Sequence, residues 1–208
     1  MSDGVELAAA LLVAGPLIGI VCLFDPPFFK VWTLPREEQL VLVAAHRLAW
    51  TMANVGFTVA TILTAAGLIV LAGSLELAVA PAATLTAGVV AYAIAGALWC
   101  AVLAIRTRTT PALAALVATD APTEPAETMI TALTGGLFAS FIVTTGVALV
   151  AIGLSLAIGG VVSPPIGFLA ALVAGLAAVG FIAYGDMLPA VLCLPTLLVG
   201  AALLLGWP

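Results

Sequence analysis

The sequence predicts an all-α protein, a polytopic bundle of about six transmembrane helices that forms a single domain over residues 1–208. Three observations carry this prediction: 64% of the residues are hydrophobic and 7% are charged, the mean hydropathy is +1.35, and the apolar residues form runs of helix length. Soluble domains carry about 25% charged residues, so this chain has too little charge to cover a surface in water. In a bilayer the apolar surface faces lipid, and helices satisfy the backbone hydrogen bonds internally.

Six segments reach the roughly 20 apolar residues that cross the hydrocarbon core. The first, 5–24, ends where Asp25 interrupts the apolar run. Its start carries Asp3 and Glu6 in place of the positive charge of a signal peptide, so we expect the span to be retained. The second, 36–72, is the longest. The other spans are expected at 84–105, 129–157, 164–183 and 187–206.

All five lysine and arginine residues lie in two of the predicted connections, 25–47 and 106–128. Positive charge stays on the cytoplasmic side of a membrane, so we expect both connections in the cytoplasm and both chain ends outside. The connection 106–128 is expected to be the longest loop, exposed and mobile, with a short surface helix at 111–118. The hydropathy layout resembles that of small uncharacterised six-span membrane proteins of bacteria and archaea, and the resemblance implies the plasma membrane of a prokaryote.

Composition and motif content exclude several classes of function. A net charge of −5 leaves no basic face for nucleic acid. The three cysteines are far apart in the sequence and there is one histidine, which argues against a disulfide framework, a metal site or a haem site. The chain has no P-loop, dinucleotide-binding turn or metalloprotease helix motif. We therefore expect neither a metal nor a cofactor.

A polar stripe runs along the second predicted helix. Its members are spaced four, three, four and three residues apart, which places them on one helical face: Arg47, Thr51, Asn54, Thr58 and Thr61. One hypothesis is that the stripe lines a ligand cavity, in which Arg47 anchors a polar headgroup and Thr51, Asn54 and Thr58 supply neutral hydrogen bonds. The alternative is that the threonines bond to carbonyls of their own helix and Asn54 bonds to a neighbouring helix.

The proposed cavity would lie between this helix and the first and sixth spans. Those two spans contain Pro16 and Pro195. A proline inside a helix frees the carbonyl four residues earlier and kinks the helix. The kinks either shape a pocket or serve packing alone.

Four residues are candidates for acid–base chemistry: Glu37, Glu38, His46 and Asp186. An imidazole can exchange protons near neutral pH, but His46 could equally be an interfacial residue that bonds to loop carbonyls or lipid headgroups. Asp186 lies at a turn before the last span, where it either caps that helix or, if buried, donates protons.

The string Pro35-Arg36-Glu37-Glu38, followed by an apolar helix, resembles the proline-x-glutamate-glutamate motif of membrane-bound lycopene cyclases of the heterodimeric type. The resemblance covers these four residues and the helix after them. It implies that Glu37 and Glu38 start the protonation of a polyene, whose product is a cyclised carotenoid. The same string also fits a helix start, because proline and acids are typical of a first helical turn.

Two classes of function follow. The leading hypothesis is a non-enzymatic membrane protein that binds or transports a small uncharged or lipid-like ligand, or that serves as a subunit of a membrane complex or homo-oligomer. The alternative is a membrane-embedded enzyme that acts on an isoprenoid or lipid by cyclase-like or isomerase-like acid–base chemistry. An enzyme of this kind requires at least two of the acid–base candidates to converge on one cavity.

Overall fold

A computed structural model describes residues 2–24, 31, 34–117, 119, 122–185 and 187–206, and within these ranges the protein is helical with no strand. Five of the helices are long and apolar enough to cross a membrane, and a shorter apolar helical segment spans Pro189–Leu204. The predicted all-α membrane bundle is therefore confirmed. The helices are α1 (Asp3–Leu23), α2 (Arg36–Ala45), α3 (Arg47–Ser74), α4 (Val79–Val117), α5 (Glu124–Ile158), α6 (Pro164–Tyr184), the 3-10 helix η2 (Pro189–Leu192) and α7 (Cys193–Leu204).

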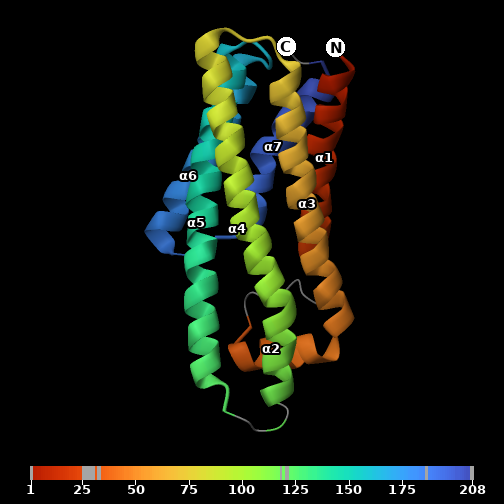
Figure 1. Ribbon diagram of the computed structural model, residues 1–208, viewed down its shortest axis with the longest axis vertical. Helices are drawn as coiled ribbons and strands as arrows, with labels where there is room; N and C mark the ends of the chain where they lie inside the picture. The colour runs from red at the N-terminus through yellow and green to blue at the C-terminus, as the bar shows by residue number, and fades with distance from the viewer. Residues whose placement is uncertain are drawn as a thin grey trace.

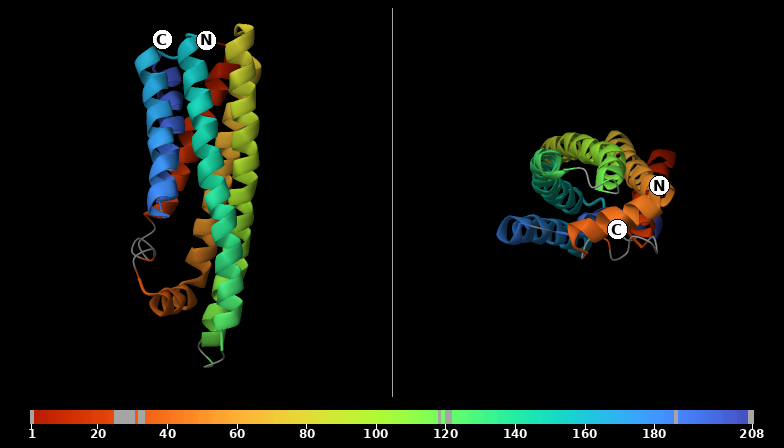
Figure 2. Two further views of the ribbon diagram at one scale, coloured as in Figure 1. Left: turned by 90° about the vertical axis from the view of Figure 1, so that its left-hand side faces the viewer. Right: turned by 90° about the horizontal axis from the view of Figure 1, so that it is seen from below.

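Six of these helices run along a common axis (Figure 1). Each contacts the next in a closed ring, in the order α1, α3, α4, α5, α6, α7 and back to α1. The short helix α2 lies across one end of the bundle and packs mainly on α4 (Figures 1 and 2). The start of α1 and the end of α7 lie together at the opposite end, as an even number of spans requires.

Helix length divides the bundle into two parts. The helices α1 and α6 have 21 residues each, which corresponds to about 31 Å at 1.5 Å per residue and matches a hydrocarbon core of about 30 Å. With 39 residues, α4 is about 58 Å long. As a result α3, α4 and α5 extend beyond the other helices at the α2 end (Figure 1). We call this part the open half and the part with all six helices the ring half.

Small residues hold the ring half together. A methyl group placed on Gly153 of α5 would lie 2.7 Å from the carbonyl oxygen of Gly167 on α6, and one placed on Gly88 of α4 would lie 3.0 Å from the carbonyl oxygen of Ala148 on α5. The first distance is too short for a side chain, and the second would require the neighbouring helix to move. Lipid tails are as apolar as the helix surfaces, so the hydrophobic effect does not hold membrane helices together. Close approach of the backbones allows them to associate by packing instead.

The second span, predicted as one helix over 36–72, is instead two helices. The chain leaves the helical region at His46, where φ is −126° and ψ is 41°. On the N-terminal side of this break, α2 turns across the bundle because Leu40 packs against Leu113 and Ala114 of α4. Neither glycine nor proline marks the break in the sequence, so the packing of α2 determines it.

The loop predicted at 106–128 is wrong at both ends, whereas the short helix expected within it at 111–118 is helical as far as Val117, as the last part of α4. Helix α4 continues to Val117 and α5 already begins at Glu124. The hydroxyls of Thr107 and Thr109 donate to the carbonyls of Leu103 and Ile105 at 2.7 and 2.8 Å. The polar residues that suggested a loop therefore continue the helix by bonding back to the preceding turn.

Candidate functional site

A large hollow among the described residues lies in the open half. It has a volume of about 640 Å³, within the range of about 300–1,000 Å³ that small-molecule sites occupy. Its described walls come from α2, α3, α4, α5 and the segment that leads into η2. We call this hollow the vestibule.

One wall of the vestibule is polar. Both charged residues among its described lining are arginines, Arg36 of α2 and Arg106 of α4. The Arg36 guanidinium donates to the side-chain oxygen of Gln39 at 3.3 Å. Hydroxyls from α4 and α5 extend this wall: Thr109, Thr110, Thr131 and Thr134.

A second wall, on the same helices but nearer the ring half, is aromatic. The indole of Trp99 stacks on Phe141 with ring centroids 4.9 Å apart and an interplanar angle of 16°. Phe138 lies 5.7 Å from Trp99 and makes an edge-to-face contact with Phe181, also at 5.7 Å. Trp99 and Phe138 line the vestibule. The cluster therefore gives the vestibule a rigid apolar wall that joins α4, α5 and α6.

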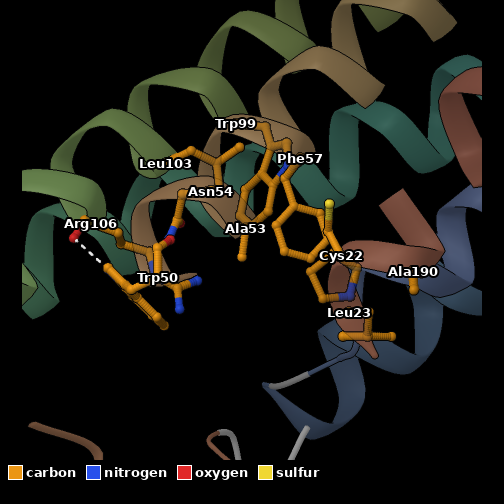
Figure 3. Close-up of a pocket in the computed structure, with 11 residues that line it drawn as sticks. Cys22, Leu23, Trp50, Ala53, Asn54, Phe57, Trp99, Leu103, Arg106 and Ala190 are labelled. Carbon is orange, nitrogen blue, oxygen red and sulfur yellow. Dashed lines mark hydrogen bonds between the residues drawn. The ribbon is translucent and has the colours of Figure 1, made fainter. Parts of the chain in front are cut away.

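Trp50 of α3 fixes Arg106 at the boundary between the two walls. The Arg106 guanidinium carbon lies 5.2 Å from the centroid of the Trp50 ring. The Trp50 indole N–H donates to the Arg106 carbonyl at 3.3 Å (Figure 3). Because one side chain contacts both the charge and the backbone of Arg106, the contact sets the arginine's position and links α3 to α4.

A smaller hollow of about 30 Å³, which we call the neck, shares Trp50, Trp99 and Arg106 with the vestibule. Figure 3 shows its lining, with the rings of Phe57 and Trp99 beside each other. Asn54 is buried in the lining, where its amide donates to the Trp50 carbonyl at 2.7 Å. The first and last spans also contribute to the neck, through Cys22 and Ala190.

A third hollow of about 50 Å³, the inner pocket, lies beyond the neck and shares Phe57 and Trp99 with it. Its polar lining is uncharged: Thr61, Thr64, Tyr92, Thr145 and Cys193. Within the described part of the chain, the hydroxyl of Thr145 has no hydrogen-bond partner, although its side chain is 2% exposed. The vestibule, neck and inner pocket therefore follow one another along α4, from the open half into the ring half.

Only some residues of the predicted polar stripe on α3 line these hollows. Asn54 lines the neck and Thr61 lines the inner pocket. The hydroxyls of Thr51 and Thr58 donate to the carbonyls of Arg47 and Asn54, each at 3.0 Å. Arg47 is exposed, and neither it nor Thr51 nor Thr58 lines the vestibule, neck or inner pocket. The arginine that lines both the neck and the vestibule is Arg106 of α4.

The acid–base candidates do not converge within the described residues. Glu37 and Glu38 are exposed in the first turn of α2, and His46 is exposed at the break between α2 and α3. None of the three lines one of the hollows. Asp186 lies outside the described residues.

Sequence analysis missed Arg106, Thr109 and Thr110 because it assigned them to a loop. Once α4 is known to continue, Trp99, Val102, Arg106 and Thr109 are spaced three, four and three apart, which is the spacing of one helical face.

Comparison of the chain with protein-family models, with curated proteins and with solved structures found no match. The site is therefore interpreted from its own geometry.

Proposed function

We propose that the protein binds a lipid-like amphiphile with a single chain and an anionic headgroup in the vestibule. The observation that carries the proposal is that one hollow is lined both by two arginines and by the aromatic rings of Trp99 and Phe138, whose centroids lie 5.7 Å apart. The planar guanidinium fork of arginine matches the geometry of carboxylate and phosphate groups. The aromatic wall offers the apolar contact that an alkyl chain needs.

The lengths of the helices support this choice of ligand. A bilayer core of about 30 Å centred on the 21-residue helices α1 and α6 would end near the vestibule, because Leu23, the last residue of α1, lines the neck that adjoins it. Arg36 and Arg106 would then lie at the level of the headgroups, and the neck would lie within the apolar core. An amphiphile in this orientation meets polar and apolar surroundings in the same order as in the membrane.

The distribution of charge supports an orientation. All four arginines belong to α2, the start of α3 and the lower part of α4, which meet at the open half. By the positive-inside rule this end faces the cytoplasm. We therefore propose a plasma-membrane protein of a prokaryote whose vestibule takes its ligand from the cytoplasmic leaflet, so that membrane lipid is its expected partner.

The test is to purify the protein in a mild detergent and to quantify the bound amphiphiles by native mass spectrometry. We expect about one anionic amphiphile per chain, because the proposal assigns one ligand to the vestibule. Arg36→Gln and Arg106→Gln should each lower its occupancy about tenfold, because each removes hydrogen bonds assisted by charge. Arg108→Gln is the matched control, because Arg108 is exposed two residues further along α4.

Three outcomes would count against the proposal. The first is a wild-type protein that retains no anionic amphiphile, and the second is an equal loss in the Arg108→Gln control. The third is a loss in Arg47→Gln with full occupancy in Arg36→Gln and Arg106→Gln, which would restore the α3 stripe as the binding surface. Apparent melting temperatures of all variants in the same detergent show whether each variant is folded. If Arg106→Gln does not fold, the occupancy of Arg36→Gln alone still tests the proposal.

A further inference from the structure

We infer that the inner pocket is a second subsite, which binds an uncharged oxygen function at the far end of the amphiphile's chain. The inference rests on the proposed function, because it concerns the other end of the same ligand. Its starting point is the buried hydroxyl of Thr145, which faces the inner pocket and has no hydrogen-bond partner among the described residues. Buried polar groups are nearly always hydrogen-bonded, and each exception calls for an explanation.

The inner pocket offers both donors and acceptors. The hydroxyls of Thr61 and Thr64 donate to the carbonyls of Phe57 and Ala60, each at 2.8 Å. A hydroxyl that donates in this way keeps lone pairs with which it can accept. Thr145 can therefore donate to a guest oxygen while Thr61 accepts from a guest hydroxyl, since Thr64 is already hydrogen-bonded to Tyr92.

The lining of the inner pocket also indicates that the group bound there is uncharged. None of the described residues that line the inner pocket is an aspartate, glutamate, lysine, arginine or histidine. A charged group buried there would have no ion partner in that lining and would be strongly disfavoured. The volume of about 50 Å³ exceeds the roughly 10–15 Å³ that one water needs, so a terminal hydroxyl or carbonyl fits.

The distance between the two subsites sets the length of the chain. From Arg106 to Tyr92, which lines the inner pocket, α4 rises by about 21 Å. An extended chain of sixteen carbons is comparable in length. The neck between the subsites is small and mostly apolar, with Phe57, Trp99 and Leu103 in its lining. It suits one unbranched alkyl chain better than a ring system or two acyl chains.

A competition experiment tests the inference on the full-length protein. Purified protein in detergent is mixed with equal amounts of hexadecanoate and 16-hydroxyhexadecanoate, and native mass spectrometry gives the ratio of the two bound species. The variant Thr145→Val removes the unpartnered hydroxyl and keeps the shape of the side chain. We expect the ratio of hydroxylated to plain acid to be about tenfold higher in the wild type than in Thr145→Val.

Two further variants keep the result interpretable. Tyr92→Phe removes the hydroxyl that α4 contributes to the described lining of the pocket and should lower the ratio in the same direction. Thr84→Val is the matched control, because Thr84 is exposed on α4 and donates to the carbonyl of Ala80, so its ratio should equal that of the wild type. Comparison between variants in one detergent also cancels the different partition of the two acids into micelles.

The possible failures are distinct. If both acids bind and the ratio is the same in the wild type and in Thr145→Val, the inner pocket holds water or empty space and the inference is overturned, while the proposed function stands. If neither acid binds to the wild-type protein, the proposed function fails and the inference fails with it.

Discussion

The ring half and the open half of the bundle use the same helices in opposite ways. On α5, Gly153 lies where a methyl group would meet the backbone of α6, whereas a methyl group on Gly136, about five turns earlier, would have no atom within 4 Å. At these two positions glycine allows α5 to approach α6 in the ring half and meets open space in the open half. The open half is less tightly packed than the ring half, and it encloses a volume in which a ligand can bind.

The hydrogen bonds between helices show the same difference. In the ring half the hydroxyl of Ser155 on α5 donates to the Pro81 carbonyl on α4 at 2.6 Å. In the open half the link between α3 and α4 is the longer bond of 3.3 Å from the Trp50 indole to the Arg106 carbonyl. We infer that the ring half carries most of the stability and that the open half is adjustable.

The largest effect is expected from a pair of identical substitutions on α5. Gly153→Ala should destabilise the protein by about 1–3 kcal/mol, because the new methyl group would overlap backbone atoms that can move only with α6. Gly136→Ala should stabilise it by about 0.4–1 kcal/mol, because alanine restricts the unfolded chain and meets no clash. The check is the shift of the apparent melting temperature of both variants in one detergent.

The opposite signs of the two shifts are the essential result. Equal shifts of the same sign would mean that the two halves are packed alike, and the comparison would be wrong. A third variant, Gly88→Ala, extends the test to the contact between α4 and α5 and should resemble Gly153→Ala.

A smaller effect is expected at the link within the open half. Trp50→Phe removes the indole N–H that donates to the Arg106 carbonyl and should cost about 1 kcal/mol. It should also weaken binding of the anionic amphiphile, because Arg106 loses a contact that fixes its position. The control is Leu48→Ala, whose side chain is 76% exposed and whose effect should stay within about 0.5 kcal/mol. A stability loss in Trp50→Phe without any change in binding would remove Trp50 from the site.

Much of the fold could be predicted from the sequence, because lipid requires long apolar helices and the composition leaves no other solvent for this chain. The helix ends were less predictable. The break at His46 follows from the packing of Leu40 on α4, which is a tertiary contact. Past Arg106, α4 contains threonines whose hydroxyls are satisfied by bonds to carbonyls of their own helix. A pattern of polarity cannot distinguish such residues from a loop.

The candidate site was predictable only in part for the same reason. Asn54 was expected near a cavity and lines the neck, because its stripe was assigned to the correct helix. Arg106 was missed because the end of its helix was set twelve residues too early, at 105 in place of 117. Thr145 gives no sequence signal, since a threonine in an apolar span ordinarily bonds to its own backbone.

The most direct test of the account is to locate a bound amphiphile within the protein. Hexadecanoate that carries a photoreactive diazirine in its chain is bound to the full-length protein and irradiated, and the labelled peptides are mapped by mass spectrometry. The account predicts labels on α4 around Trp99 and on α5 around Phe138, and excess plain hexadecanoate should abolish them. Labels confined to outward-facing residues of α6 such as Leu172 and Leu176, unchanged by excess hexadecanoate, would contradict it.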